Sequence, residues 1–127
     1  MEYLLDTVTI IRHFTDIGKT GKKAKKILKA ISNNKFMISV ISLMEILYLS
    51  EKNRINLSLK YTISKINSSI NYTILDLTPE ILEVAETIEF KELHDRLILA
   101  TAKWLNIPVI SSDKQFERVD DIEVIWD

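Results

Sequence analysis

Four acidic residues stand where apolar segments of this chain end or begin: Asp6, Glu45, Asp95 and Asp113. Carboxylates are costly to place beside an apolar core unless a cation gathers them. If the fold brings the four together, their oxygen atoms favour a hard divalent cation, Mg²⁺ or Mn²⁺. The pattern therefore predicts metal-assisted phosphodiester chemistry.

Each of these residues also has a local explanation. Asp6 can cap a following helix, and Ser42-Leu43-Met44-Glu45 matches the S-x-x-E capping box. Asp95 can complement the positive end of a helix dipole, and Asp113 opens a polar turn of the kind in which Asp is common. Taken singly, the four residues leave both interpretations open.

The elements that must position these carboxylates alternate along the chain. Short apolar or β-branched segments predict strands at 3–5, 36–41, 72–77, 109–111 and 122–126. Helical spacing predicts helices from about residue 7, over 24–31, from residue 42, and over 59–70, 79–88 and 93–105. Strands separated by helices favour an α/β fold with a parallel sheet.

The predicted order of elements allows the four carboxylates to meet. Sites in open parallel sheets form outside the carboxyl ends of the strands. Asp6 and Asp113 follow such ends directly, whereas Glu45 and Asp95 are expected in the first turns of their helices.

Composition sets the class of protein. At 127 residues the chain fits one domain spanning 1–127, and 46% of its residues are hydrophobic. It has no cysteine, which excludes disulfides, thiolate metal sites and cysteine nucleophiles. No segment reaches the roughly 18 uninterrupted apolar residues that a membrane span needs, and acidic Glu2 and Asp6 come too early for a basic secretory leader. We expect a cytoplasmic protein with no membrane partner.

Basic side chains are concentrated in one segment, between residues 19 and 29. Such a run can hold a phosphate backbone by sequence-independent attraction, although it can equally be a solvated helix face. The candidates for contact with an RNA backbone are Arg12, Lys22, Lys23, Lys25, Lys26, Lys29, Arg96 and Lys114.

Taken with their neighbours, the acidic positions resemble four motifs of the PIN-domain family, in particular its small VapC-type toxin ribonucleases. Leu4-Leu5-Asp6-Thr7 is similar to the first motif, and the segment 38–46, which ends in Glu45-Ile46, is similar to the second. The segment His94-Asp95-Arg96 with its alanine-bearing continuation resembles the third motif, and 108–116, with Ser111 and Asp113, resembles the fourth. The motifs occur in family order over almost the whole chain.

The resemblance implies a PIN-like α/β/α sandwich around a mostly parallel sheet of about five strands. It implies a metal-dependent endoribonuclease in which Asp6, Glu45, Asp95 and Asp113 bind Mg²⁺ or Mn²⁺ and catalyse cleavage, with Thr7 and Ser111 as supporting polar residues. It also implies an RNA substrate, a cognate VapB-type antitoxin and a homodimer.

The chain departs from the family at two positions. Val8 stands where the family often has Ser or Asn, and Arg96 follows Asp95 where a small residue is common. Neither change removes a candidate ligand.

Three other functions compete with a toxin ribonuclease. A housekeeping RNA-processing nuclease of the same family would have the same site, and a non-catalytic binding module could use the same scaffold. A phosphoacceptor receiver domain fits poorly, because only one acid follows the first predicted strand and no lysine precedes the last strand in the expected place.

Overall fold

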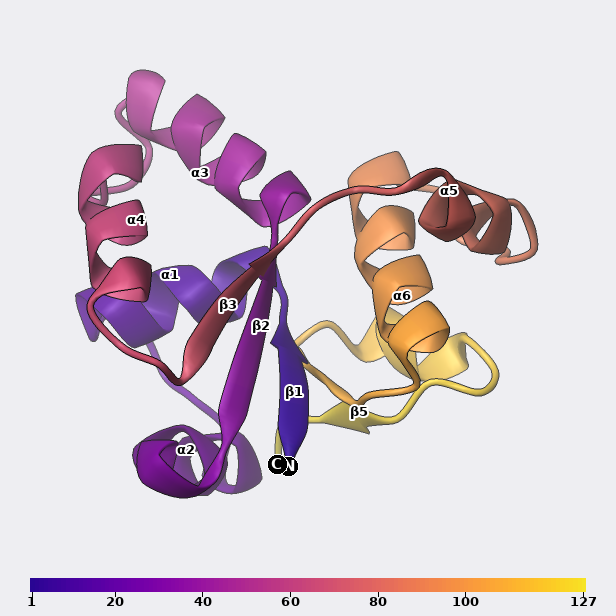
Figure 1. Ribbon diagram of the computed structural model, residues 1–127, viewed down its shortest axis with the longest axis horizontal. Helices are drawn as coiled ribbons and strands as arrows, with labels where there is room; N and C mark the ends of the chain where they lie inside the picture. Colours follow the sequence, from indigo (N-terminus) through magenta and orange to yellow (C-terminus); the bar gives the residue numbers. More distant parts are fainter.

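The computed structural model describes residues 1–127, which form a five-stranded parallel sheet between two layers of helices (Figure 1). The strands lie in the order β3-β2-β1-β4-β5. Their bounds are β1 Glu2–Leu5, β2 Lys35–Ser39, β3 Tyr72–Leu75, β4 Val109–Ile110 and β5 Val124–Ile125. Each pair of neighbouring strands is parallel.

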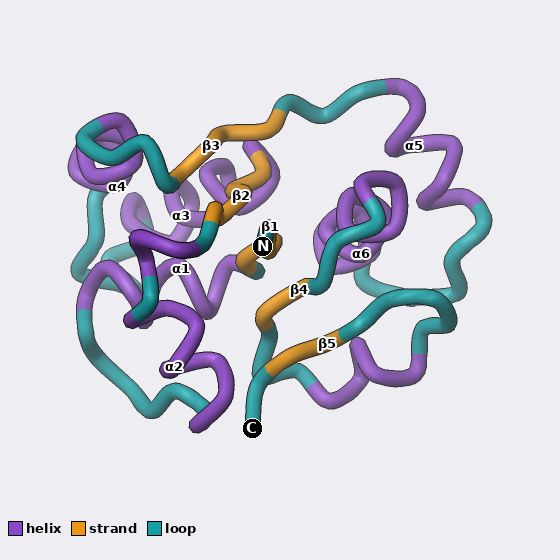
Figure 2. Tube along the Cα trace, turned by 60° about the horizontal axis from the view of Figure 1, so that its bottom comes forward, coloured by secondary structure: helices purple, strands orange, loops and turns teal.

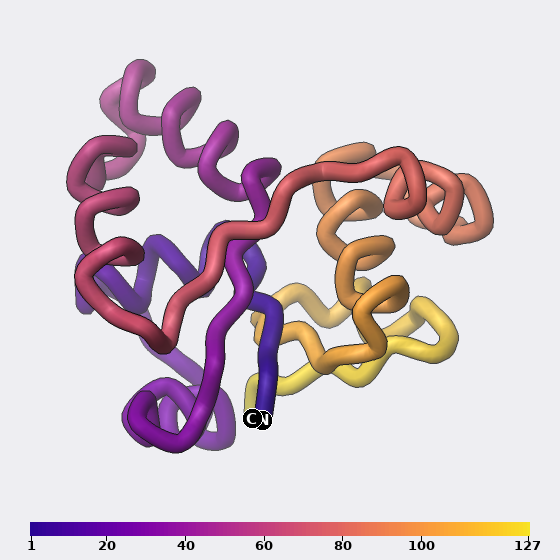
Figure 3. The backbone as a smooth tube through the Cα atoms, in the orientation of Figure 1, coloured from indigo at the N-terminus to yellow at the C-terminus, as the bar shows by residue number.

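Four helices cover one face of the sheet and two cover the other (Figure 2). The first group comprises α1 Thr7–Thr15, α2 Lys22–Lys29, α3 Val40–Glu51 and α4 Leu59–Asn67, and the second comprises α5 Pro79–Glu86 and α6 Leu93–Leu105. Two 3₁₀ turns complete the chain, η1 Ile31–Asn33 and η2 Lys114–Arg118. After β3 the chain passes from the first layer to the second (Figure 3).

The alternation of side chains along the strands produces two cores. Tyr3 and Leu5 of β1 pack into the cluster beneath α1 to α4, whereas Leu4 between them packs into the cluster beneath α5 and α6. Successive side chains of a strand point to opposite faces, so a strand buried on both faces has a continuous apolar sequence. This is why the buried residues of β1 and β2 are apolar up to Ser39, the last residue of β2.

The predicted fold class is confirmed: the protein has an α/β fold with five parallel strands. The predicted boundary between the second strand and its helix is wrong. β2 ends at Ser39, whose hydroxyl accepts the N–H of Ile41 at 3.1 Å, so that α3 begins at Val40 rather than at Ser42. Val40 and Ile41 have the β-branched side chains of a strand, but the cap supplied by Ser39 turns the chain into a helix.

Several other predicted elements extend beyond the observed ones. β3 ends at Leu75, β4 at Ile110 and α4 at Asn67, and β5 contains only Val124 and Ile125. Apolar residues beyond those points, such as Leu77, pack against the core from connecting segments. No helix is long and apolar enough to cross a membrane.

The sheet order determines where a site can form. β1 lies between β2 and β4 in the sheet. After β1 the chain reaches β2 through α1 and α2, but it reaches β4 only after the second helical layer. Parallel α/β sheets place their crevice at such a reversal of strand order, outside the carboxyl ends of the strands. Asp6 and Ser111 are the residues that directly follow β1 and β4 at this reversal.

Candidate active site

Asp6 lies at the carboxyl end of β1, and the fold fixes both of its carboxylate oxygens. Oδ1 accepts the N–H of Thr9 at 2.9 Å, which makes Asp6 the N-cap of α1. Oδ2 accepts the hydroxyl of Ser111 at 2.5 Å from the end of β4. The side chain is buried, with 6% of its surface exposed. Asp6 therefore both caps the helix and faces the reversal point of the sheet.

Ser111 connects Asp6 to Asp113. Its hydroxyl oxygen accepts the backbone N–H of Asp113 at 3.1 Å while its hydrogen goes to Asp6. The Asp113 carboxylate in turn accepts the N–H of Gln115 at 2.9 Å and caps η2. The turn chemistry expected for Asp113 is thus present, and the same turn places Asp113 one hydrogen-bonded residue away from Asp6.

Glu45 reaches the site from the second turn of α3, because that helix begins at Val40. Its Oε1 accepts the hydroxyl of Thr7 at 2.5 Å, and the Thr7 oxygen also lies 3.0 Å from Oγ of buried Ser42. The capping-box explanation of Glu45 is therefore wrong: Ser39 caps the helix, and Ser42 faces Thr7. The hydroxyl of Thr7 attaches Glu45 to the start of α1.

Asp95 is the third residue of α6, within its first turn as expected. The cap is a different residue, since Glu92 accepts the N–H of Asp95 at 2.7 Å. Glu92 also pairs with His94 at 3.1 Å, the only salt bridge in the structure. The side chain of Asp95 is left without a hydrogen-bond donor.

The electrostatics of these carboxylates show that they share one neighbourhood. Burial raises the pKa of Asp95, and the negative charges of Glu92, Glu45, Asp113 and Asp6 add to that rise in that order, so that together they bring the pKa to about 6. Burial also raises the pKa of Asp6 and of Glu45, although hydrogen bonds from Ser111 and Thr9 and from Thr7, respectively, oppose that rise. No Lys or Arg forms a salt bridge with any of the four candidate acids.

This donor set fits a hard divalent cation by its chemistry. The four acids offer only carboxylate oxygens, which repel one another and form no salt bridge with Lys or Arg. As the side chains lie, no group of three acidic or histidine residues stands close enough to hold a metal ion. The structure therefore shows uncompensated negative charge at the carboxyl edge of the sheet rather than a preformed coordination shell.

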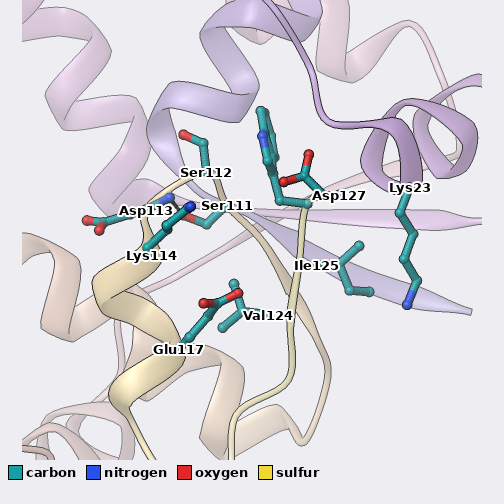
Figure 4. A pocket seen from close by; sticks show the side chains of 10 residues that line it. Lys23, Ser111, Ser112, Asp113, Lys114, Glu117, Val124, Ile125 and Asp127 are labelled. Carbon is teal, nitrogen blue, oxygen red and sulfur yellow. Dashed lines mark hydrogen bonds between the residues drawn. The ribbon is translucent and has the colours of Figure 1, made fainter.

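The expected basic residues are only partly gathered at this edge. Lys23 and Lys114 line a cavity of about 140 Å³ together with Ser111 and Asp113, where Lys23 comes from α2 on the opposite side from Asp113 (Figure 4). Arg12 is used within the fold, since it donates to the carbonyl of Lys19 at 3.1 Å and lies 5.6 Å from the Trp126 ring.

The other lysines of α2 form an exposed helix face, opposite buried Ala24 and Leu28. Arg96 is half-buried and its Nε has no hydrogen-bond partner. Neither Arg96 nor these lysines line the cavities that contain Asp113 or Asp95.

Sequence reasoning missed Glu92, which caps α6 and whose charge raises the pKa of Asp95 more than that of any other acid. The signal was its spacing, because a carboxylate three residues before Asp95 can accept that residue's N–H. It also missed Gln115 and Arg118, which line a second cavity with Asp95 and are brought there only by η2.

Comparisons with known proteins find the same fold in several solved structures. Among solved structures, VapBC2 from Rickettsia felis, bound to a DNA fragment from its promoter, has a chain that superposes with a TM-score of 0.75 at 20% identity, covering 100% of both chains. DNA-bound VapBC from Salmonella typhimurium gives 0.71 at 20% identity, covering 98% of this chain and 97% of the other. A toxin-antitoxin complex from Klebsiella pneumoniae gives 0.66 at 24% identity, with 97% and 95% covered.

These likenesses are at low identity and show a shared fold. A search of curated proteins finds no match. The family model described as PIN domain matches residues 3–122, nearly the whole chain and every motif that carries a candidate acid. The chain therefore belongs to the PIN-domain family.

Proposed function

We propose that this protein is a metal-dependent endoribonuclease and the toxin of a toxin–antitoxin pair. The observation that carries the proposal is the group of carboxylates at the sheet reversal: burial and the charges of neighbouring acids raise the pKa of Asp95 and of Glu45, and no Lys or Arg forms a salt bridge with any of the four. Membership of the PIN-domain family supports nuclease chemistry for such a group.

In this proposal Asp6, Asp95 and Asp113 would hold Mg²⁺ or Mn²⁺, with Glu45 beside them. The bound ion would make a water molecule more acidic and neutralise charge on the phosphodiester. The hydroxyl of Ser111 donates to Asp6, which favours its ionised form and fixes its orientation, and Thr7 does the same for Glu45. Lys23 and Lys114 would attract the RNA backbone toward Asp113.

The test is cleavage of a mixed RNA pool by purified protein with Mg²⁺, with Mn²⁺ and with EDTA. We expect cuts only with a metal, and a loss of about a hundredfold or more in the Asp95→Asn variant, because electrostatic stabilisation of this kind is worth several kcal/mol. Asp76→Asn is the matched control, since Asp76 is exposed and follows β3 outside the site. Cuts that survive EDTA or Asp95→Asn would contradict the proposal.

The partner proposal rests on the named assemblies of the structural relatives and on one surface of this chain. Exposed Met44 and Tyr48 line a cavity of about 450 Å³ with Glu45, Leu49 and His94. An apolar surface that adjoins a candidate catalytic carboxylate suits a protein that blocks the site. We propose that a VapB-type antitoxin binds here, and that the toxin is a homodimer.

Co-expression with a candidate VapB-type antitoxin tests this partner. Stable co-purification should be lost in Tyr48→Ala and kept in Tyr61→Ala, which replaces an exposed tyrosine on α4.

Sedimentation of the free protein measures the dimer; a monomer at micromolar concentration would contradict the homodimer.

A further inference from the structure

A second cavity adjoins the acidic site. Gln115 and Arg118 of η2 line it, whereas Lys114 of the same turn lines the first cavity. The second cavity has a volume of about 270 Å³ and lies between the segment that joins α5 to α6 and the η2 turn. Asp95 is part of its wall, so whatever occupies the cavity lies next to a candidate catalytic residue. The volume is close to the lower end of the roughly 300–1,000 Å³ range of small-ligand pockets.

The cavity has an aromatic and aliphatic lining. Phe90 is half-buried and is fixed by an edge-to-face contact with buried Phe116, with ring centroids 5.5 Å apart. Val119 lines the cavity as well and is half-buried. A rigid aromatic side chain in the wall of a cavity beside a nuclease site suits a planar nucleobase, because single-stranded bases are bound by stacking on such rings.

The polar lining has free hydrogen-bonding capacity. The side chains of four lining residues make no hydrogen bond and no salt bridge within the protein: Glu89, Lys91, Gln115 and Arg118. By contrast, the Glu92 carboxylate is already used by the backbone N–H of Asp95 and by His94. The cavity therefore offers one free carboxylate, one free guanidinium, one free amide and the free ammonium group of Lys91.

This combination selects among the four bases. Guanine presents two acceptors, O6 and N7, which match the paired donors of an arginine. On its Watson–Crick edge guanine also presents two donors, N1–H and the 2-amino group, which match the two oxygens of a carboxylate. Adenine lacks the O6 acceptor and the N1–H donor, and the pyrimidines lack N7. Guanine is therefore the only one of the four bases that offers Arg118 a pair of acceptors on one edge and Glu89 a pair of donors on the other.

We propose that this cavity is a guanine-binding subsite for the RNA substrate, in which Arg118 and Glu89 read the base and Phe90 stacks on it. Gln115 adds a further hydrogen bond. The proposal rests on the proposed function, since it takes RNA as the substrate. It makes the enzyme select a guanosine beside the phosphodiester that it cuts.

Binding tests the subsite without any cleavage. Five-nucleotide RNAs that differ only in the central base, set among uridines, are titrated with wild-type protein in EDTA and followed by fluorescence anisotropy. We expect guanosine to bind about tenfold more tightly than adenosine, with inosine in between because it lacks the 2-amino group. Equal binding of the guanosine, adenosine and inosine RNAs would overturn the proposal.

Matched variants assign the preference to its residues. Arg118→Ala and Glu89→Gln should reduce the preference for guanosine to within about twofold, because each removes one half of the recognition. Arg54→Ala and Glu83→Gln change exposed residues of the same types outside this cavity and should leave it unchanged. A preference that survives in both Arg118→Ala and Glu89→Gln would overturn the assignment.

Two further arms separate the possible outcomes. If the dissociation constant of free GMP, measured by its displacement of the RNA, equals that of the guanosine RNA, the cavity is a nucleotide site and the substrate subsite is overturned. If guanosine is preferred but no metal produces cleavage, the subsite stands and the nuclease proposal fails. If the RNA pool is cut without preference for guanosine near the cut, the nuclease stands and the subsite is overturned.

Discussion

At the scale of single residues, the candidate site lowers the free energy of unfolding of the metal-free protein. Asp95 has a raised pKa because it is partly buried and because its charged neighbours are also acids. Ionising it in the folded protein opposes the folded state, whereas the same group in the unfolded chain ionises freely. A site whose carboxylates repel one another in this way is consistent with selection for function over stability.

The cost at Asp95 predicts an unusual dependence of stability on pH. Between its ordinary pKa of 3.8 and its folded value of about 6, the folded protein binds more protons than the unfolded chain. The free energy of unfolding therefore falls as the pH rises through this window, and the full penalty is present above it. The raised pKa values of Asp6 and Glu45 act in the same direction.

Asp95→Asn should remove this penalty. The pKa difference corresponds to at most about 3 kcal/mol, and screening by solvent reduces the expected gain in stability to about 1 kcal/mol at pH 7.5 in EDTA. At pH 3.5, where Asp95 is protonated in the folded protein and mostly protonated in the unfolded chain, the gain should nearly vanish. Urea denaturation at the two pH values measures it, and an Asn variant that is less stable than wild type at pH 7.5 would contradict this account.

Ser111 controls Asp6 in the same account. Ser111→Ala removes the donor that lowers the pKa of Asp6, so that this pKa rises further above its ordinary value. The acidic limb of the pH–cleavage profile should move to higher pH, and stability should fall by about 1–2 kcal/mol because a buried charge-assisted hydrogen bond is lost. Ser112→Ala, in the neighbouring half-buried position, is the control; an unmoved acidic limb in Ser111→Ala would rule out this role.

At the scale of elements, the sequence predicted which segments are strands and helices more accurately than where they begin. Apolar runs and helical spacing are strong over Tyr3–Leu5 and Leu93–Leu105, and both elements formed there, with β1 also taking in Glu2. The start of α3 was misplaced because Val40 and Ile41 favour a strand locally, while the cap at Ser39 and the end of the sheet decide the boundary. That shift moves Glu45 from the first turn to the second, where Thr7 can reach it.

The position of α2 depends on contacts that the sequence pattern did not reveal. Gly21 lies against the C-terminal segment, and a Cβ atom there would lie 2.2 Å from the carbonyl oxygen of Trp126. The same carbonyl accepts the N–H of Ala24 at 2.9 Å. Trp126 thereby holds the lysine-bearing helix, including Lys23, beside the end of β5.

Gly21→Ala should therefore displace α2. Overpacking against backbone typically costs about 1–3 kcal/mol, and we expect a loss of about 2 kcal/mol in the free energy of unfolding. RNA affinity should fall as well, because Lys23 moves with the helix. Lys22→Ala, at an exposed position of the same turn, is the control for stability, and equal stability of Gly21→Ala and wild type would argue against the contact.

At the scale of the whole molecule, the site exists because the order of strands reverses beside β1. This reversal brings Asp6 and Ser111 together although 105 positions separate them. The sequence could place Asp6 and Asp113 after strands, but it could not specify which strands are neighbours. It also gave no sign that η2 would carry Gln115 and Arg118 to the far side of Asp95, since those contacts depend on tertiary packing.

The central claim is that the carboxylates at this reversal act together as one cation-dependent centre. Its most direct test is a calorimetric titration with Mn²⁺ of wild-type protein, Asp95→Asn and the control Asp76→Asn. We predict one saturable transition at pH 7.5, weakened at least about tenfold in Asp95→Asn and weakened in wild type at pH 5, because the proton on Asp95 must leave before the ion binds. The same affinity in all three proteins at both pH values would contradict the account.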